Sequence, residues 1–427
     1  MKRALTMSML ALILLTQAQA ALAREVIDVW LPTWAWTYPE VINEFMTRFQ
    51  QEHPEYEINV TVVAGGQSEF EAKLLTAIAG GTSPDLSFFN RASLIEVMAL
   101  HDLLVPVDEV LEVNGLSGQS FLQSLENQLT MKGRLYGVPY VLEGRGLFYN
   151  RTLFDEAGLD RHQPPKTIDE LDEFAQRLTR READGYDQFG FSPSHGGMEA
   201  VAWMWGFGGD VFDWNTGQPT LAGVEGNLKA LEWIQSYGNR YNAADVTAFF
   251  QENGGVLPAF GDGKYAMLGF ASVFIRIAQR DYPGLDFTYA ILPYAEGGRV
   301  PTYSGGGAWV IPRGADNLTG AGKLLAYLVD LENEIEYFER SGNLPVRRDS
   351  IARLLEMLEG SDDTTILNVV RTAEFLNPTP PGWRAIYSSI PVGAIFSGQI
   401  SPAEALITAQ QRVENAFAEM QLIEKWR

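Results

Sequence analysis

Cysteine is absent from this sequence of 427 residues. A chain without cysteine forms no disulfide, holds no zinc–thiolate site and offers no thiol nucleophile. It also lacks the residue that carries the lipid of a bacterial lipoprotein at the signal cleavage site. The stability of the protein must therefore come from an ordinary hydrophobic core.

Histidine is scarce, and the short motifs of several enzyme classes are missing. The four histidines are His53, His101, His162 and His195. None is paired at metal-ligand spacing, so we expect no metal and no other cofactor. The glycine run 305–307 lacks the Lys-Ser/Thr pair of a P-loop, and no G-x-S-x-G nucleophile elbow occurs. Paired carboxylates for glycoside hydrolysis stay open, because 54 acidic residues offer many pairs and nothing local selects one.

A long apolar run occurs only at the N-terminus, and even this one is short of a membrane span. Lys2 and Arg3 precede it, and two small-residue A-x-A sites follow it at 18–20 and 21–23. This layout is typical of a cleavable secretory signal, which we assign to residues 1–23. Because no cysteine is available for a lipid anchor, we expect the mature protein to be free in the periplasm.

Basic residues are also in short supply. The chain has 32 Lys and Arg against 54 Asp and Glu, a net charge of −22 at pH 7. Binding of nucleic acid or of an anionic membrane relies on clustered Lys and Arg. Neither is therefore expected as a partner, and the charge says little about a small ligand.

The first segments after the signal alternate between strand and helix patterns. Strands are predicted over 26–31, 57–63 and 84–89, with a helix over 38–52 and another that opens at the capping box 68–71. The inward residues of the first helix are Val41, Ile42, Phe45, Met46 and Phe49. This β-α-β-α-β order predicts a parallel sheet with helices on both faces and a ligand beyond the carboxyl ends of its strands. The chain length suits two domains.

Tryptophan is the informative residue type. Six tryptophans lie beside loop or glycine-rich segments: Trp34, Trp36, Trp203, Trp205, Trp309 and Trp383. Sugars stack their C–H faces on aromatic rings, but large aromatic side chains also fill protein cores. We expect Trp30 and Trp233 in the core. For Trp34 and Trp36, which follow the first strand, both roles remain open from the residues alone.

Several stretches, taken in order, resemble one known family. They are 79–86 (AGGTSPDL), 133–139 with 147–151 (LFYNR), 154–159 (FDEAGL) with 165–167, 260–267 (FGDGKYAM), 292–293 with 304–311, and 342–347 (GNLPVR) before a final capped helix. The chain resembles the extracellular solute-binding proteins of family 1, the maltose-binding-protein-like group of ABC importers. The matching stretches span nearly the whole mature chain.

The resemblance implies an α/β protein with the two-lobed periplasmic-binding-protein fold of type II. Each lobe would hold a mainly parallel sheet flanked by helices, with the ligand cleft between the lobes. The N-terminal lobe would comprise 24–142 plus 287–342, and the C-terminal lobe 143–286 plus 343–427. The chain would cross between them near 141–146, 281–288 and 342–347. Hinge closure around the ligand would present a closed form to the importer.

The resemblance also implies a set of ligand-binding residues. Glu143 stands where family members place a carboxylate for sugar hydroxyls, and Phe270 where a stacking tryptophan is common. Asn90 and Arg91 replace an Asp-Arg pair of maltose-binding relatives, which argues against maltose itself. The full predicted set is Trp34, Trp36, Gln67, Asn90, Arg91, Glu143, Trp205, Phe270, Ser272, Gly305, Gly306 and Arg347. For Arg347, a hinge salt bridge is an equal alternative.

These features predict a monomeric binding protein, not an enzyme, that delivers a carbohydrate (an oligosaccharide, disaccharide or polyol) to the permease subunits of an ABC importer. Relatives in this family also bind glycerol 3-phosphate or its diesters, and several arginines with the 304–307 run would suit a phosphate. A secreted polysaccharide-degrading enzyme is the alternative from another class, and no motif supports it.

Overall fold

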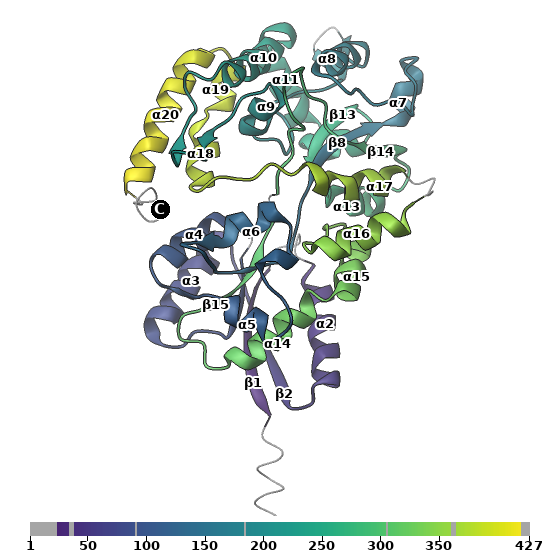
Figure 1. The fold of residues 1–427 in the computed structure, drawn as a ribbon. Coiled ribbons are helices and arrows are strands. Elements are labelled where there is room, and N and C mark those ends of the chain that lie inside the picture. Colours follow the sequence, from purple (N-terminus) through teal and green to yellow (C-terminus); the bar gives the residue numbers. More distant parts are fainter. Residues whose placement is uncertain are drawn as a thin grey trace, which may run out of the picture.

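The structure is a computed structural model that describes residues 24–33, 38–89, 92–182, 185–304, 306–359 and 364–419. Two lobes lie one above the other, and the chain passes between them several times (Figure 1). No helix in these ranges is long and apolar enough to cross a membrane. The predicted signal, residues 1–23, lies outside the described residues.

The first lobe is built on a six-stranded sheet with the order β2-β1-β3-β15-β4, to which β7 adds by pairing with β15. Its strands are β1 (Glu25–Pro32), β2 (Tyr56–Val63), β3 (Leu86–Phe89), β4 (Leu104–Val105), β7 (Val138–Pro139) and β15 (Ala308–Pro312). Strand β1 is parallel to both β2 and β3, whereas β15 is antiparallel to its neighbours. The predicted β-α-β-α-β unit is therefore confirmed, and the late strand β15 makes the sheet mixed.

Helices cover both faces of this sheet. They are α2 (Pro39–Glu52), α3 (Gln67–Gly80), α4 (Ala92–Leu100), α5 (Asp108–Glu112), α6 (Gln123–Leu129), α14 (Leu318–Leu328) and α15 (Leu331–Ser341). The buried residues of α2 are those that its helical spacing predicted. Helix α3 begins two residues earlier than the capping box 68–71 predicted: its N-cap is Gly66 and not Ser68, and Glu69 accepts the Gly66 N–H at 3.2 Å. The carboxylate that caps this helix is thus Glu69.

The second lobe departs from the expected parallel sheet. Its strands β8 (Arg145–Asn150), β13 (Met267–Ala271) and β14 (Phe287–Ala290) form an antiparallel sheet with the order β13-β8-β14. The register gives the reason: Arg145 pairs with Ala271, and Ala290 with Leu147. Strand β8 carries the chain away from the first lobe, and its two neighbours carry it back, so they run in the opposite direction.

Helices also surround this second sheet. They are α7 (Arg151–Glu156), α8 (Ile168–Arg177), α9 (Ala200–Gly206), α10 (Glu225–Tyr241), α11 (Ala243–Glu252), α12 (Val256–Gly261), α13 (Phe274–Asp281), α17 (Thr364–Arg371), α18 (Trp383–Ser389), α19 (Val392–Phe396) and α20 (Pro402–Glu419). Helix α16 (Arg348–Met357) lies between the lobes (Figure 1). Trp233 is buried in this lobe as predicted, with its indole N–H donating to Asp172 at 2.9 Å.

The described crossings lie side by side at the junction of the lobes. In the first, Leu142 accepts a hydrogen bond of 2.9 Å from the Leu344 N–H of another. The return to the first lobe comes later than the predicted residue 287. Strand β14 belongs to the second sheet, and Arg299 N–H still donates to the Trp205 carbonyl there. Only at Gly307, whose N–H donates to Val141, does the chain rejoin the first lobe.

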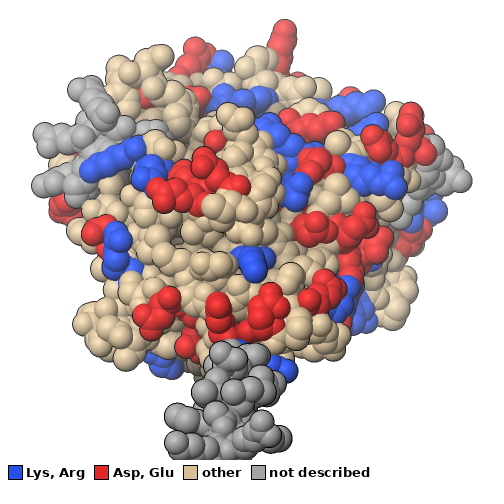
Figure 2. All heavy atoms as spheres, turned by 60° about the horizontal axis from the view of Figure 1, so that its bottom comes forward, with Lys and Arg blue, Asp and Glu red and all other residues tan. Residues whose placement is uncertain are grey.

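Charged side chains of both signs alternate on the base of the first lobe. On the face seen in Figure 2, single Lys and Arg side chains lie among more numerous Asp and Glu side chains. This face therefore offers no continuous basic surface of the kind that binds nucleic acid.

Candidate functional site

The first crossing delivers two charged residues to the junction of the lobes. Glu143 lies in the crossing itself and is half-buried, and Arg145 begins β8 and is 9% exposed. Gly144 separates them, because a Cβ there would come within 2.8 Å of the Thr372 side chain. The close packing of Gly144 thus fixes where both neighbours emerge.

The guanidinium of Arg145 is held by its own lobe. It donates to the Gly197 carbonyl at 3.2 Å and to the Glu143 carbonyl at 3.0 Å, and it lies over the Tyr303 ring at 4.2 Å. Its Nε and Nη1 donate to backbone oxygens, and its face lies against an aromatic ring. Arg145 therefore holds two backbone segments and the Tyr303 ring together at the junction of the lobes.

The carboxylate of Glu143 has no hydrogen-bond or ion-pair partner among the described residues. Burial raises the pKa of this carboxyl, Arg145 lowers it, and the charge of Glu199 raises it again. Glu199 lies just before α9, and its Oε2 is buried without a partner in the described part of the chain. The carboxyl groups of Glu143 and Glu199 thus lie close enough for their charges to interact, and oxygens of both lack a hydrogen-bond donor among the described residues.

Aromatic rings lie beside Arg145, beginning with Tyr303. Trp383, at the start of α18, stacks on Trp205 with the ring centres 5.5 Å apart and the planes 6° apart. Tyr303 packs against Trp383 at 5.3 Å, and its hydroxyl is buried with no hydrogen-bond partner in the described residues. We call Glu143, Arg145, Glu199, Tyr303 and Trp383 the junction cluster. It combines ring faces with unpaired oxygens.

Phe270 adds a further ring at the end of β13. It pairs in register with Gly146, and its ring contacts Phe274 at 5.7 Å. A Cβ at Gly197 would approach the Phe270 ring to 2.6 Å, so a glycine is needed where the 192–199 loop passes this ring. Because Gly197 also binds Arg145, Phe270 lies beside the junction cluster and keeps part of its ring exposed.

Three other predicted site residues are buried. Trp205 is 1% exposed, and its indole N–H donates to Asp210 at 3.4 Å. It supports Trp383 from behind. Ser272 is fully buried, and its N–H donates to the Gly144 carbonyl at 2.8 Å. Gly306 directs its N–H to Ser304 Oγ at 3.2 Å, and a Cβ there would collide with the Val141 carbonyl. Gly306 thus permits two crossings to pack.

Arg347 has intramolecular partners at the third crossing. Its guanidinium binds Asp349 at 2.8 Å and the Val329 carbonyl at 3.1 Å, and the buried carboxylate of Glu334 accepts its backbone N–H at 3.3 Å. This geometry favours the hinge salt bridge of the two alternatives.

Trp34, Trp36, Asn90, Arg91 and Gly305 lie outside the described residues, as does the side chain of Gln67, which opens α3. Their ligand contacts stay predictions. The segments that hold the first four follow β1 and β3, which are parallel neighbours in the sheet.

Four residues of the junction cluster are absent from the predicted site: Arg145, Glu199, Tyr303 and Trp383. The sequence marks Trp383 only as a loop tryptophan, although a Trp beside Arg384 after two prolines is a usable signal. Tyr303 and Glu199 have no local signal, because their position depends on the second crossing and on the start of α9.

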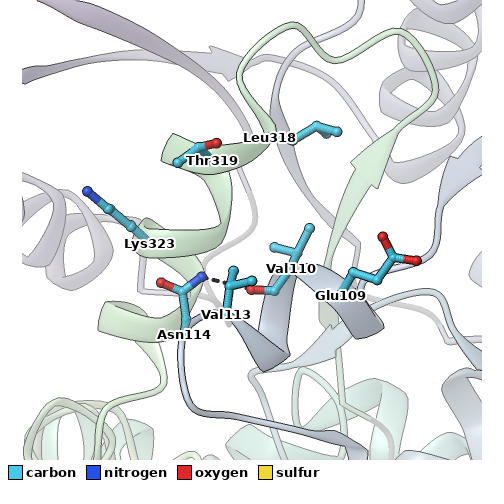
Figure 3. Close-up of a pocket in the computed structure, with 7 residues that line it drawn as sticks. All are labelled: Glu109, Val110, Val113, Asn114, Leu318, Thr319 and Lys323. Atoms are coloured by element: carbon cyan, nitrogen blue, oxygen red, sulfur yellow. Dashed lines mark hydrogen bonds between the residues drawn. The ribbon is translucent and has the colours of Figure 1, made fainter.

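A groove on the outer side of the first lobe is separate from this cluster. It has a volume of about 340 Å³ and lies between α5 and α14 (Figure 3). Its lining residues are Glu109, Val110, Val113, Asn114, Leu318, Thr319 and Lys323. None of them belongs to a crossing or to the junction cluster. In the described part of the chain, no group of three or more acidic or His side chains is arranged to hold a metal ion.

The family model of bacterial extracellular solute-binding proteins matches residues 35–334. The chain belongs to this family. The resemblance seen in the sequence is therefore confirmed, and with it the two-lobed α/β fold.

Relatives within the family are named for different functions. A putative binding protein of Brucella abortus is 25% identical over 378 residues, which cover 87% of this chain and 88% of the relative. The sn-glycerol-3-phosphate-binding periplasmic protein UgpB of Brucella abortus is 28% identical over 328 residues, covering 72% and 71%.

Solved structures of the family superpose over almost the whole chain. The protein CpMnBP1, solved with mannotriose bound, is 25% identical with a TM-score of 0.76, covering 91% of this chain and 100% of that one. The sugar-binding protein MalE from Xanthomonas citri has a TM-score of 0.77 at 21% identity, covering 94% and 100%. The second likeness shows the fold.

Proposed function

We propose that the protein is the periplasmic solute-binding subunit of an ABC importer and that its solute is a carbohydrate. The family supplies the binding role, and the junction cluster supports the chemical class of the ligand. The protein would act by hinge closure, because the cluster lies where the lobes meet and two of its residues, Glu143 and Tyr303, lie in crossings.

The observation that carries the proposal is the pairing of ring faces with unpartnered oxygens. Trp383 and Phe270 offer apolar faces to the C–H side of a pyranose. The Glu143 carboxylate, Glu199 Oε2 and the Tyr303 hydroxyl lack partners in the described residues. Buried polar atoms normally have hydrogen-bond partners, and sugar hydroxyls would supply them. A buried carboxylate that accepts hydroxyl donors makes the stronger, charge-assisted kind of hydrogen bond.

The same charges argue against a phosphate ligand. Glu143 and Glu199 place two acidic groups near each other, and Arg145 directs its donors to carbonyl oxygens. A phosphate would meet repulsion from the carboxylates, and two of the three guanidinium nitrogens, Nε and Nη1, already donate to backbone oxygens. The relation to UgpB therefore supports the transport role more than the glycerol phosphate ligand.

A ligand panel tests the proposal. The purified mature protein is titrated with mannobiose, mannotriose, maltose, sorbitol, glycerol 3-phosphate and a glycerophosphodiester, following tryptophan fluorescence and melting temperature. We expect a saturable change with a saccharide or polyol. A response only to the phosphates would overturn the carbohydrate class, and steady release of reducing ends from a polysaccharide would overturn the binding role.

Two cellular measurements test the transport setting. Fractionation with N-terminal sequencing should find the mature chain in the periplasm, beginning after residue 20 or 23. Deletion of the gene should abolish uptake of the labelled solute found in the panel, and a copy of the gene should restore it. Unchanged uptake would contradict the importer role.

A further inference from the structure

One hydrogen bond joins the two lobes away from the crossings. Glu96 lies in α4 of the first lobe, is 6% exposed, and accepts the backbone N–H of Gly382 at 3.0 Å. Gly382 is the N-cap of α18 in the second lobe and has a φ of 64°. This left-handed backbone favours glycine, and it aims the N–H across the junction at the carboxylate.

This contact lies on the side of the molecule away from the crossings. Figure 1 shows α4 and α18 facing each other on the side opposite α13, α15 and α16. The crossings that are joined by the hydrogen bond from the Leu344 N–H to Leu142 lie on the side of α13, α15 and α16. A rotation about the hinge moves the far side of the lobes most. Opening therefore breaks the Glu96–Gly382 bond while the hydrogen bonds between the crossings persist.

The contact is also linked to the junction cluster, because one of its residues is the sequence neighbour of a cluster residue. Gly382 precedes Trp383, whose ring stacks on Trp205. Asn377 anchors the other end of the same segment: its side chain receives the Arg299 guanidinium at 2.5 Å and donates to the Thr302 carbonyl at 2.8 Å. The segment 377–383 is thus fixed to the second lobe by Asn377 and to the first lobe by Glu96.

We propose that Glu96 is a positioning residue that latches the closed form and sets the place of Trp383. The latch rests on the proposed function, since the ring it sets is a proposed ligand contact. In the open form the Glu96 carboxylate regains water and the Gly382 N–H loses a charged acceptor. Hydrogen bonds to charged groups are worth about 1.5–3 kcal/mol. Losing this one therefore lowers the ratio of closed to open molecules by about 10- to 150-fold.

The absence of cysteine makes closure measurable. Leu75 on α3 and Ile407 on α20 are exposed. These two helices belong to different lobes and lie on the same side of the molecule as α4 and α18 (Figure 1). The double variant Leu75→Cys, Ile407→Cys accepts two fluorophores without competing thiols. Single-molecule energy transfer then gives the closed fraction, without ligand and at saturating saccharide. Stopped-flow fluorescence gives the association and dissociation rates of the saccharide.

We expect Glu96→Ala to lower the closed fraction and to raise the dissociation rate by about tenfold or more. Association should not become slower, because the ligand enters the open form. Glu96→Gln keeps an acceptor oxygen and should recover most of the wild-type behaviour. The matched control, Glu112→Ala on α5, removes an exposed carboxylate of the same lobe and should change neither quantity.

Two outcomes are decisive. If Glu96→Ala lowers the melting temperature but leaves the closed fraction and the dissociation rate unchanged, Glu96 is a packing residue and the latch is wrong. If no saccharide changes the wild-type signal while Glu96→Ala still lowers the closed fraction of the free protein, the latch stands and the proposed ligand class fails.

Discussion

His195 gives the loop beneath the junction cluster a predictable response to acid. Its ring stacks on Phe250 at 4.7 Å, and Nδ1 lies 2.9 Å from the hydroxyls of Ser192 and Ser194. Burial lowers the pKa of this imidazole from 6.5 to about 4. The unfolded chain therefore takes up a proton at a pH where the folded chain does not. Stability is fully present above pH 6.5 and falls as the pH drops toward 4.

The magnitude follows from the two pKa values. Each tenfold difference in proton affinity corresponds to about 1.4 kcal/mol. The charging of His195 should therefore reduce the free energy of unfolding by about 2 kcal/mol at pH 5 and about 3 kcal/mol at pH 4. Carboxylates also titrate in this range, so the wild-type curve alone does not isolate the histidine.

The contribution of His195 can be isolated by comparing variants. Urea unfolding is followed by circular dichroism at pH 7.5, 6, 5 and 4. His195→Phe keeps an aromatic ring against Phe250 and removes the titrating group, so its stability should fall less steeply below pH 6.5 than that of the wild type. His162→Gln, at an exposed histidine, should follow the wild-type curve. If the free energies of unfolding of His195→Phe and wild type fall in parallel within about 0.5 kcal/mol, the destabilisation assigned to the charging of His195 is wrong.

Three further variants separate binding from stability. Glu143→Gln should weaken saccharide binding by about 1–2 kcal/mol without lowering the melting temperature, because its carboxylate has no protein partner among the described residues; the exposed Glu173→Gln is its control. Trp383→Ala should weaken binding by at least about 1 kcal/mol in calorimetry, whereas Phe375→Ala, at a 42% exposed ring, should not. Arg347→Ala should lower the melting temperature and leave the affinity nearly unchanged, because its partners Asp349 and Val329 are intramolecular. A reversed pattern for any of the three would contradict the role assigned to that residue.

The sequence allows the first lobe to be predicted better than the second. Short-range periodicity determines α2 and the strands β1 to β3, and these appear as expected. The direction of the second sheet cannot be found in this way. It depends on the chain entering through β8 and returning through β13 and β14, which is a property of the whole path. For the same reason the predicted return crossing lies too early in the chain.

The site residues indicated by family position are of two kinds in the structure, accessible and buried. Family position indicates Glu143 and Phe270, and the structure places both at the junction of the lobes with part of each side chain accessible. The same reasoning indicates Trp205, Ser272 and Gly306, and these are buried. A family position therefore predicts which loop reaches the junction. Only packing decides which side chains there stay accessible: Trp205 on α9 is covered, whereas Trp383 on α18, which stacks on it, is half-buried.

The order of these two tryptophans connects recognition to closure. Trp205 is fixed from behind by Asp210, and Arg299 lies 5.7 Å from its ring while also binding Asp210. A ring stacked on this fixed base can shift only along the plane of contact. Its neighbour Gly382 resists that shift only while Glu96 holds the N–H. A ligand that fills the space beside Trp383 therefore favours the same ring position as the latch. Their free energies are coupled, so ligand and Glu96 should each raise the effect of the other on the closed fraction.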